Sequence, residues 1–356
     1  MAPLTRNRSD DDWVPTAINR GPSAYDLVEY YEQRACVPGT LIIAEATLVS
    51  SRTACAKYVP GIWTQAQIEG WKSITDAVHA KGCKIFSQLI HRGRAGNPEI
   101  LAKSGFQVQS SSAVPIGPGY ATPVAMTEER IAEAISDFVT AAQNSIAAGF
   151  DGVEIHGANG YLIDQFLQDT CNKRTDRWGG SIENRSRFLI EITKAVIAAV
   201  GADKTAMRLS PYSDFQAMLM DDPDPTFSYL LDQLKPMDLA YLHLIEARIS
   251  GNDDADCGGQ RTVRWMVEQW GNATPVLIAG GFTAQSARTA VDETYKDYDV
   301  SIVFGRYFIS NPDLVFRIKT GLPLDKYDRS SFYTQDAKGY TDYPFSQQFL
   351  SAPVSS

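Results

Sequence analysis

The stretch Asp151–Phe166 reads DGVEIHGANGYLIDQF, beginning as a buried β-strand and ending as a helix. His156, Asn159 and Tyr161 stand at the junction, and the glycines between them permit the backbone angles of a tight turn. The three side chains can therefore project into one pocket. An imidazole and a carboxamide would offer hydrogen bonds to a carbonyl or nitro oxygen, and a phenol can supply a proton. The plain alternative is a core histidine, a turn asparagine and a tyrosine at a helix start.

Outward from this stretch, strand-like apolar runs alternate with helical patterns along almost the whole chain. Eight short β-rich segments, each followed by a helix pattern, predict a closed (β/α)₈ TIM barrel in a single domain spanning residues 1–356. The expected strands are Met1–Leu4, Leu41–Thr47, Lys84–Ile90, Gly152–His156, Thr205–Leu209, Ala240–Ile245, Pro275–Ala279 and Ser301–Phe304. The expected helices are Ala24–Ala35, Gln65–Lys81, Glu128–Ala148, Ser181–Val200, Thr226–Leu234, Thr262–Trp270, Ala284–Tyr295 and Pro312–Lys319.

Two segments stand outside this alternation. Residues 97–123 form a long stretch rich in Gly, Ser and Pro, which predicts a loop that caps the barrel mouth. Residues 335–356 are expected to form a C-terminal tail.

Composition narrows the function classes. The chain of 356 residues has 33 basic and 42 acidic side chains, a formal charge of −9, which argues against nucleic-acid or anionic-membrane partners. There is no apolar run long enough to span a membrane, and the N-terminus lacks the apolar core of a secretory signal, so a cytoplasmic location is expected. Five widely spaced cysteines without a CxxC pair fit a reducing compartment, and no histidines stand at metal-ligand spacing. We predict no metal site.

In a TIM barrel the chemistry sits at the carboxyl ends of the strands. Polar residues and glycines at those ends cannot be explained by core packing, so they favour a functional interpretation. The strand-end residues are Thr5, Ala46, Gln88, His156, Arg208, Arg248, Gly280, Gly281, Gly305 and Arg306.

A series of ordered motifs then identifies a family. They are MAPLTR at Met1–Arg6, PGIWT at Pro60–Thr64, HGANGYLIDQFL at His156–Leu167, NKRTDRWGGSIENRSRF at Asn172–Phe188, RLSPY at Arg208–Tyr212, AGGFT at Ala279–Thr283, FGRYFISNPDL at Phe304–Leu314 and GLPLDKYDRSSFY at Gly321–Tyr333. Together they resemble the old yellow enzyme family of FMN-dependent NADPH dehydrogenases and ene-reductases, over nearly the whole chain. The last two blocks look most like fungal members, which suggests a role in secondary metabolism.

The resemblance implies an FMN site built from the strand ends. The isoalloxazine of FMN would be flanked by Pro3, Leu4, Thr5 and Ala46, and its pyrimidine side would be held by Gln88 and Arg208. The FMN phosphate would be held by Gly280, Gly281, Gly305 and Arg306. Tyr333, with Phe332, would lie at the open mouth over the flavin and bind substrate.

The resemblance also implies a reaction. NADPH would reduce the flavin, and an enone or enal would then bind with its oxygen on His156 and Asn159 while Tyr161 protonates the α-carbon. The partners would be small molecules, and the protein a monomer or homodimer. Two alternatives stay open: an FMN-containing isomerase or oxidase of a specialised metabolite, and a flavin-free binding barrel.

Several positions depart from the family pattern. Members usually extend further before MAPLTR, so the barrel is predicted to be N-terminally short, with Met1–Thr5 near a free end where order is least secure. Ile90 replaces the tryptophan of many yeast-type members and should reshape the substrate pocket. Residues 249–259 form an unusually acidic loop, expected at the entrance.

Overall fold

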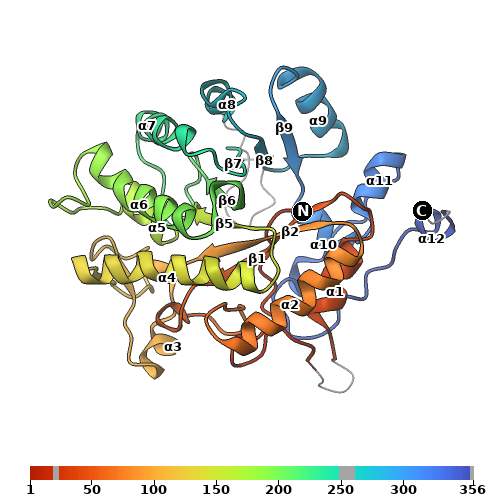
Figure 1. Ribbon diagram of the computed structural model, residues 1–356, viewed down its shortest axis with the longest axis horizontal. Helices are drawn as coiled ribbons and strands as arrows, with labels where there is room; N and C mark the ends of the chain where they lie inside the picture. The colour runs from red at the N-terminus through yellow and green to blue at the C-terminus, as the bar shows by residue number, and fades with distance from the viewer. Residues whose placement is uncertain (19–23, 248–260, 353–356) are drawn as a thin grey trace.

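The computed structural model describes residues 1–18, 24–247 and 261–352, and its centre is a parallel seven-stranded sheet (Figure 1). The strand order is β1-β2-β5-β6-β7-β8-β9, and a second, two-stranded sheet pairs β3 with β4. The strands are β1 Leu41–Leu48, β2 Lys84–Ile90, β3 Gln109–Ser110, β4 Val124–Ala125, β5 Gly152–Gly157, β6 Thr205–Leu209, β7 Leu242–Ile245, β8 Val276–Ala279 and β9 Val300–Val303. The expected α/β architecture is confirmed.

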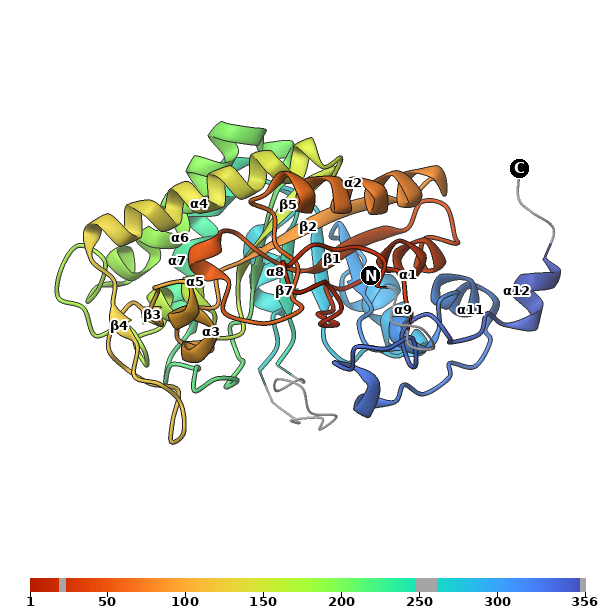
Figure 2. The same ribbon diagram turned by 90° about the horizontal axis from the view of Figure 1, so that it is seen from below.

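The helices surround the central sheet in chain order (Figure 1). Several begin at a side chain that accepts a hydrogen bond from an exposed amide of the first turn: Thr64, Thr127 and Ser181 do so. The helices are α1 Leu27–Arg34, α2 Gln65–Ala80, α3 Pro98–Lys103, α4 Glu128–Ala147, α5 Leu162–Leu167, α6 Ile182–Val200, α7 Asp224–Leu234, α8 Arg264–Trp270, α9 Ala284–Thr289, α10 Tyr307–Ser310, α11 Leu314–Thr320 and α12 Gln347–Ser351. Figure 2 shows α2 and α4 along one side of the molecule, α3 on the opposite side from α4, and α12 at one end.

The strands are buried on both faces, as expected for a parallel sheet covered by helices. Alternation along β1 illustrates this: Ile42 and Ala44 belong to the large core beneath the helices, whereas Ile43 belongs to a smaller apolar cluster. Phe86, Leu277 and other strand residues complete that second cluster on the opposite face of the sheet.

The prediction of eight strands with Met1–Leu4 as the first is wrong for the described structure. Residues 1–4 form no strand. Met1 N donates to the carbonyl oxygen of Leu41, Ile43 N donates to that of Met1, and Ala2 N donates to that of Phe304, but among the described residues this pairing does not continue as a ladder to residue 4. The segment nevertheless contacts both edge strands. Met1 and Ala2 are buried, whereas Pro3, Leu4 and Thr5 are half-buried.

The other expected strands and helices are present with small shifts at their ends, and the last turns of the Ala284–Tyr295 helix are a π-helix over Ala290–Thr294. The segment 97–123 is less loop-like than expected, since it contains α3 and β3. The predicted tail also packs: Tyr340 is buried and stacks on Tyr30, with ring centroids 4.2 Å apart.

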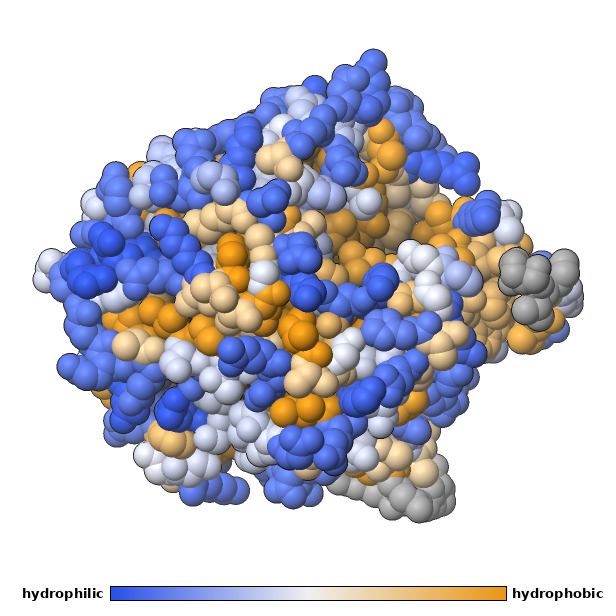
Figure 3. All heavy atoms as spheres, in the orientation of Figure 1, coloured by the Kyte–Doolittle hydropathy of each residue, from blue (hydrophilic) through white to orange (hydrophobic). Residues whose placement is uncertain are grey.

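The surface in Figure 3 is largely hydrophilic, with apolar residues in patches between polar ones. Within the described ranges, no helix is both long and apolar enough to cross a membrane. The acidic loop 249–259 and Arg248 lie outside the described residues.

Candidate active site

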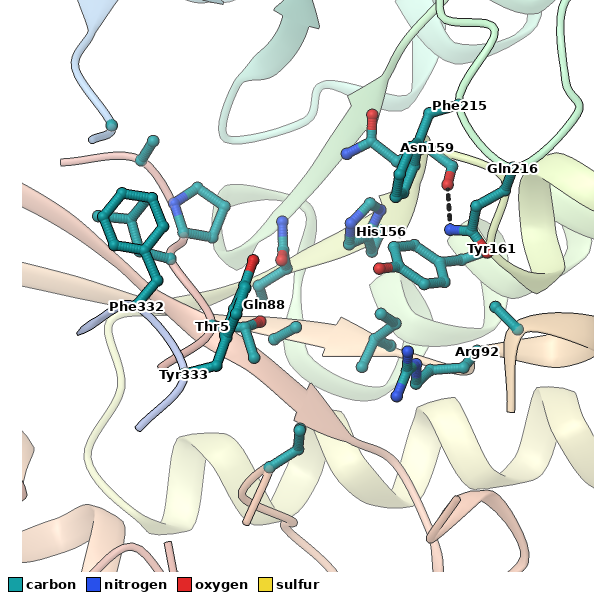
Figure 4. Close-up of a pocket in the computed structure, with 18 of the residues that line it drawn as sticks. Thr5, Gln88, Arg92, His156, Asn159, Tyr161, Phe215, Gln216, Phe332 and Tyr333 are labelled. Carbon is teal, nitrogen blue, oxygen red and sulfur yellow. Dashed lines mark hydrogen bonds between the residues drawn. The ribbon is translucent and has the colours of Figure 1, made fainter. Parts of the chain in front are cut away.

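A cavity of about 1340 Å³ lies at the carboxyl ends of the central strands, and all described residues nominated from the sequence line it (Figure 4). These are Pro3, Leu4, Thr5, Ala46, Gln88, His156, Asn159, Tyr161, Arg208, Gly280, Gly281, Gly305, Arg306, Phe332 and Tyr333. The segment predicted to cap the mouth also contributes, through Asn97, Ile116 and Tyr120. The structure thus brings the nominated positions together, and their roles stay predictions.

Strand register explains why residues far apart in sequence meet here. Ala46 lies opposite Gln88 and Gln88 opposite Glu154, while His156 lies opposite Arg208 on the next strand. In a sheet, side chains two residues apart on one strand share a face, so Glu154 and His156 point to the same side. Parallel pairing therefore lines up one polar row across the three neighbouring strands β2, β5 and β6.

His156 is arranged as a neutral hydrogen-bond donor. Burial, reinforced by the nearby Arg208 charge, lowers the pKa of His156 to about 3. The backbone amide of Ala158 donates to its Nδ1 at 3.3 Å, so in the neutral ring the proton sits on Nε2. An Nε2–H group can donate to an oxygen in the cavity.

The turn after β5 has left-handed backbone at two residues, Asn159 (φ 58°) and Gly160 (φ 71°). The backbone N–H of Asn159 donates to Ser210 Oγ at 2.8 Å. Gln216 Nε2 donates to the backbone carbonyl oxygen of Asn159 at 2.7 Å, which is the dashed line of Figure 4. A Cβ on residue 160 would lie 2.8 Å from the Cβ of Gln216. The prediction that Gly157 makes this turn is wrong, because Gly157 ends β5 and the asparagine takes the special conformation.

Tyr161 follows directly, in the N-cap position of α5. Its ring meets His156 edge-on at 5.0 Å between centroids and packs against an apolar cluster that includes Ala56 and Ile90. Burial raises the pKa of Tyr161, against the opposing effect of Arg92. The phenol is therefore protonated at neutral pH, as a proton donor must be.

Glu154 forms a buried network that the sequence reading missed. Gln88 Nε2 donates to its Oε1 at 2.7 Å, and His243 Nδ1 lies 2.7 Å from its Oε2. Burial opposes ionisation, but the contacts with His243, Arg208 and Gln88 outweigh it and lower the pKa of Glu154 to about 2. Burial also lowers the pKa of His243, so we assign a neutral ring that donates its Nδ1 proton to the carboxylate. A lone Glu within an apolar strand could have signalled such a network, since buried carboxylates need partners.

The opposite end of the cavity suits an anionic cofactor. Gly280 (φ 136°) and Gly281 (φ 62°) adopt backbone angles that other residues rarely take, and a Cβ on Gly280 would lie 2.7 Å from that of Glu246. Arg208 Nε is buried without a hydrogen-bond partner among the described residues, and Arg306 stands at the start of α10. An unmatched donor at one place in the cavity wall and a tight glycine backbone at another fit a ligand such as FMN, which brings acceptor oxygens and a phosphate.

Two arginines that the sequence analysis did not nominate, Arg6 and Arg8, join the N-terminal segment to the segment that carries Phe332 and Tyr333. Arg6 and Arg8 are buried, and both donate to the carbonyl oxygen of Phe332, at 3.0 and 3.1 Å. Arg6 also donates to the Gly339 carbonyl oxygen at 2.7 Å. These bonds hold the segment that carries Tyr333 against Thr5.

Comparison with known proteins adds independent findings. A model of the NADH:flavin oxidoreductase / NADH oxidase family matches residues 1–325. A chanoclavine-I aldehyde reductase of Penicillium roqueforti (strain FM164) is 51% identical over 354 residues, covering 99% of this chain and 93% of that protein. An NADP-dependent oxidoreductase of Aspergillus flavus is 50% identical over 355 residues, covering 98% and 92%.

A protein of Epichloe festucae var. lolii that bears the name "Probable inactive reductase" is 49% identical over 356 residues, covering 98% of this chain and 92% of that protein. Among solved structures, an old yellow enzyme homologue from Zymomonas mobilis matches with a TM-score of 0.84 at 37% identity, covering 97% of this chain and 94% of that one. Since proteins named active and inactive are about equally similar, the activity has to be argued from the site.

Proposed function

This chain belongs to the NADH:flavin oxidoreductase / NADH oxidase family, the family of the old yellow enzymes, and we propose that it is an ene-reductase. It is an FMN-dependent NAD(P)H oxidoreductase. The proposed reaction reduces the activated C=C bond of an α,β-unsaturated carbonyl compound. The observation that carries the proposal is a neutral His156, Asn159 and a protonated Tyr161 around one cavity.

FMN would be held by the residues nominated from the sequence. Arg208 Nε, which has no hydrogen-bond partner among the described residues, and Gln88 would bind the pyrimidine side of FMN. The backbone at Gly280 and Gly281 would bind the FMN phosphate. When bound, FMN supplies the hydride for the β-carbon of the substrate.

The chain's own residues supply the remaining chemistry. His156 Nε2–H and the Asn159 carboxamide donate to the carbonyl oxygen, which draws electrons away from the double bond and makes the β-carbon electrophilic. Tyr161 gives its proton to the α-carbon. The turn that holds Asn159 is fixed by Ser210 and Gln216, so the donor is positioned before substrate arrives.

An enal is the favoured substrate form, because relatives of this chain are named aldehyde reductases. We further propose a single-domain closed barrel in which residues 1–4 fill the gap between β9 and β1, consistent with their hydrogen bonds to Phe304 and Ile43. A cytoplasmic monomer or homodimer acting in fungal secondary metabolism completes the proposal.

The test is Tyr161→Phe with the two half-reactions measured separately under anaerobic conditions. Reduction of bound FMN by NADPH should stay within about twofold, whereas reoxidation by an enal should slow at least about 100-fold, because general acid catalysis contributes that much. Tyr229→Phe, on α7 and outside the cavity lining, is the control and should change neither rate greatly. Equal slowing of both half-reactions would defeat the role of Tyr161. Conversion of substrate without consumption of NADPH would instead favour the isomerase alternative.

A further inference from the structure

The cavity is positively charged although the protein is acidic. Its described lining includes five cationic side chains and no Asp or Glu: Lys57, Arg92, Arg208, Arg306 and Lys326. The whole chain carries a formal charge of −9. Positive charge is therefore concentrated where ligands bind, which favours anions.

FMN accounts for only part of this charge. Arg208 lies opposite His156 in the polar row of the sheet. The Arg306 guanidinium lies over the ring of Tyr327, 5.6 Å from its centroid, and Tyr327 directly follows Lys326 in the sequence. These three cations belong to the proposed flavin end of the cavity.

Arg92 and Lys57 lie at the other end, around Tyr161. Figure 4 shows Arg92 beside Tyr161 and away from Phe332. The loop that carries Lys57 is joined to this end, because the carbonyl oxygen of Cys55 accepts from Asn97 N at 3.1 Å and Ala56 packs in the same cluster as Tyr161.

Arg92 also differs from Arg94 in that its side chain has no hydrogen-bond or ion-pair partner among the described residues. The Arg94 guanidinium donates to the carbonyl oxygens of Val114 and Gln216 at 3.1 and 2.8 Å. The half-buried Arg92 guanidinium makes no hydrogen bond or ion pair within the ranges that the structure describes. A partly desolvated cation without a partner binds an incoming anion with less further cost than a fully hydrated one.

We propose that Arg92, with Lys57 at the mouth, forms the subsite for the phosphate groups of NADPH. The inference rests on the proposed function: NADPH would give its hydride to the flavin and the enal would take it from there, so the nicotinamide has to reach the same open side of the flavin as the enal. The remainder of NADPH must then leave through the same cavity, and its phosphates are its anionic groups. A carboxylate on the oxidant would be recognised by the same chemistry, so the experiment has to separate these two sources.

The first measurement is equilibrium binding of NADP⁺ to the FMN-loaded enzyme by titration calorimetry. Arg92→Met, which keeps much of the length and removes the charge, should weaken binding about tenfold, equivalent to about 1.4 kcal/mol. Lys57→Met should weaken it about threefold. Arg130→Met removes an exposed charge on α4 that is paired with Glu133, and should leave binding unchanged. A loss seen with NADP⁺ and not NAD⁺ assigns the 2′-phosphate, a loss with both assigns the pyrophosphate, and either result supports the subsite.

The second measurement follows flavin bleaching in a stopped-flow instrument. With NADPH, Arg92→Met should raise the apparent Kd about tenfold and leave the limiting rate within twofold. With 1-benzyl-1,4-dihydronicotinamide, which has no phosphate, variant and wild type should behave alike.

An equal effect on the phosphate-free reductant would overturn the proposal, as would unchanged NADP⁺ binding. An effect confined to oxidants that carry a carboxylate would place the anion on the oxidant and also overturn it. If NADPH fails to bleach the wild-type flavin, the proposed function fails, whereas the calorimetric result still decides whether Arg92 binds phosphate.

Discussion

Replacing Glu154 by Gln tests the buried charge network beneath the site. Glutamine keeps the shape, and it keeps the contacts with Gln88 and His243 when the His243 proton moves from Nδ1 to Nε2, but it removes the negative charge near Arg208. The variant therefore isolates the charge from the packing. We expect a folded protein of lower stability.

The magnitude follows from the pKa. A carboxyl whose pKa falls from 4.5 to about 2 on folding contributes about 3 kcal/mol at pH 7, at about 1.36 kcal/mol for each pKa unit. Because the folded pKa of Glu154 is depressed, this contribution is present above the unfolded pKa and is lost as the pH falls towards the folded value. The difference between wild type and variant should thus shrink to about half by pH 3.

The assay is urea unfolding at several pH values between 7 and 3, with the same excess of FMN in both samples. Glu69→Gln, an exposed acid on α2, is the control and should follow wild type at every pH. A Glu154→Gln protein as stable as wild type at pH 7 would refute the reasoning. So would a stability difference that does not change with pH, because a lost charge has to titrate.

Two further variants test the backbone around the cavity. Gly280→Ala should weaken FMN binding at least tenfold, because the new Cβ would lie 2.7 Å from that of Glu246 in a backbone conformation that costs about 1–3 kcal/mol for other residues. Fluorescence titration with FMN measures this, and Gly39→Ala, strained but with nothing within 4 Å of its Cβ, should lose stability without losing FMN affinity. Arg94→Met should cost about 2 kcal/mol and slow the oxidative half-reaction more than the reductive one, since Arg94 holds the loop of Gln216; unchanged stability and rates would contradict that role.

Much of the fold could be predicted from sequence because parallel strands covered on both faces are continuous apolar runs. The expected bounds Lys84–Ile90 and Thr205–Leu209 coincide with β2 and β6. Met1–Leu4 was expected as a strand on the same grounds, but strand formation requires a ladder of bonds from neighbours, and this segment makes too few. In the segment 97–123, Asn97 followed by proline is a helix-start signal. The prediction of a loop was based on the Gly, Ser and Pro content of the whole segment and did not use this signal.

The parts of the site that could not be predicted depend on distant partners. His243 is 89 residues from Glu154 in sequence, and Arg6 donates to Gly339, 333 residues away. No local pattern indicates such pairs. From sequence alone, Arg6 would be expected to be a solvated surface charge, because the carbonyl oxygens that bind it come from the far end of the chain. Glu154 interrupts an apolar strand pattern, and its role becomes clear only when its neighbours in the sheet are known.

The network also explains how the site divides its chemistry. Glu154 gives the buried Arg208 a counter-charge, and Arg208 in turn helps to keep His156 uncharged. A neutral His156 with a pKa of about 3 can donate a hydrogen bond at neutral pH but has no acidic proton to give. Under the proposed function the proton therefore comes from another group, and Tyr161, whose ring contacts His156 in the cavity, is our candidate. Relatives named active and inactive are both about 50% identical to this chain, so overall similarity does not decide activity, and the proposed division between donor and acid is what the Tyr161→Phe experiment tests.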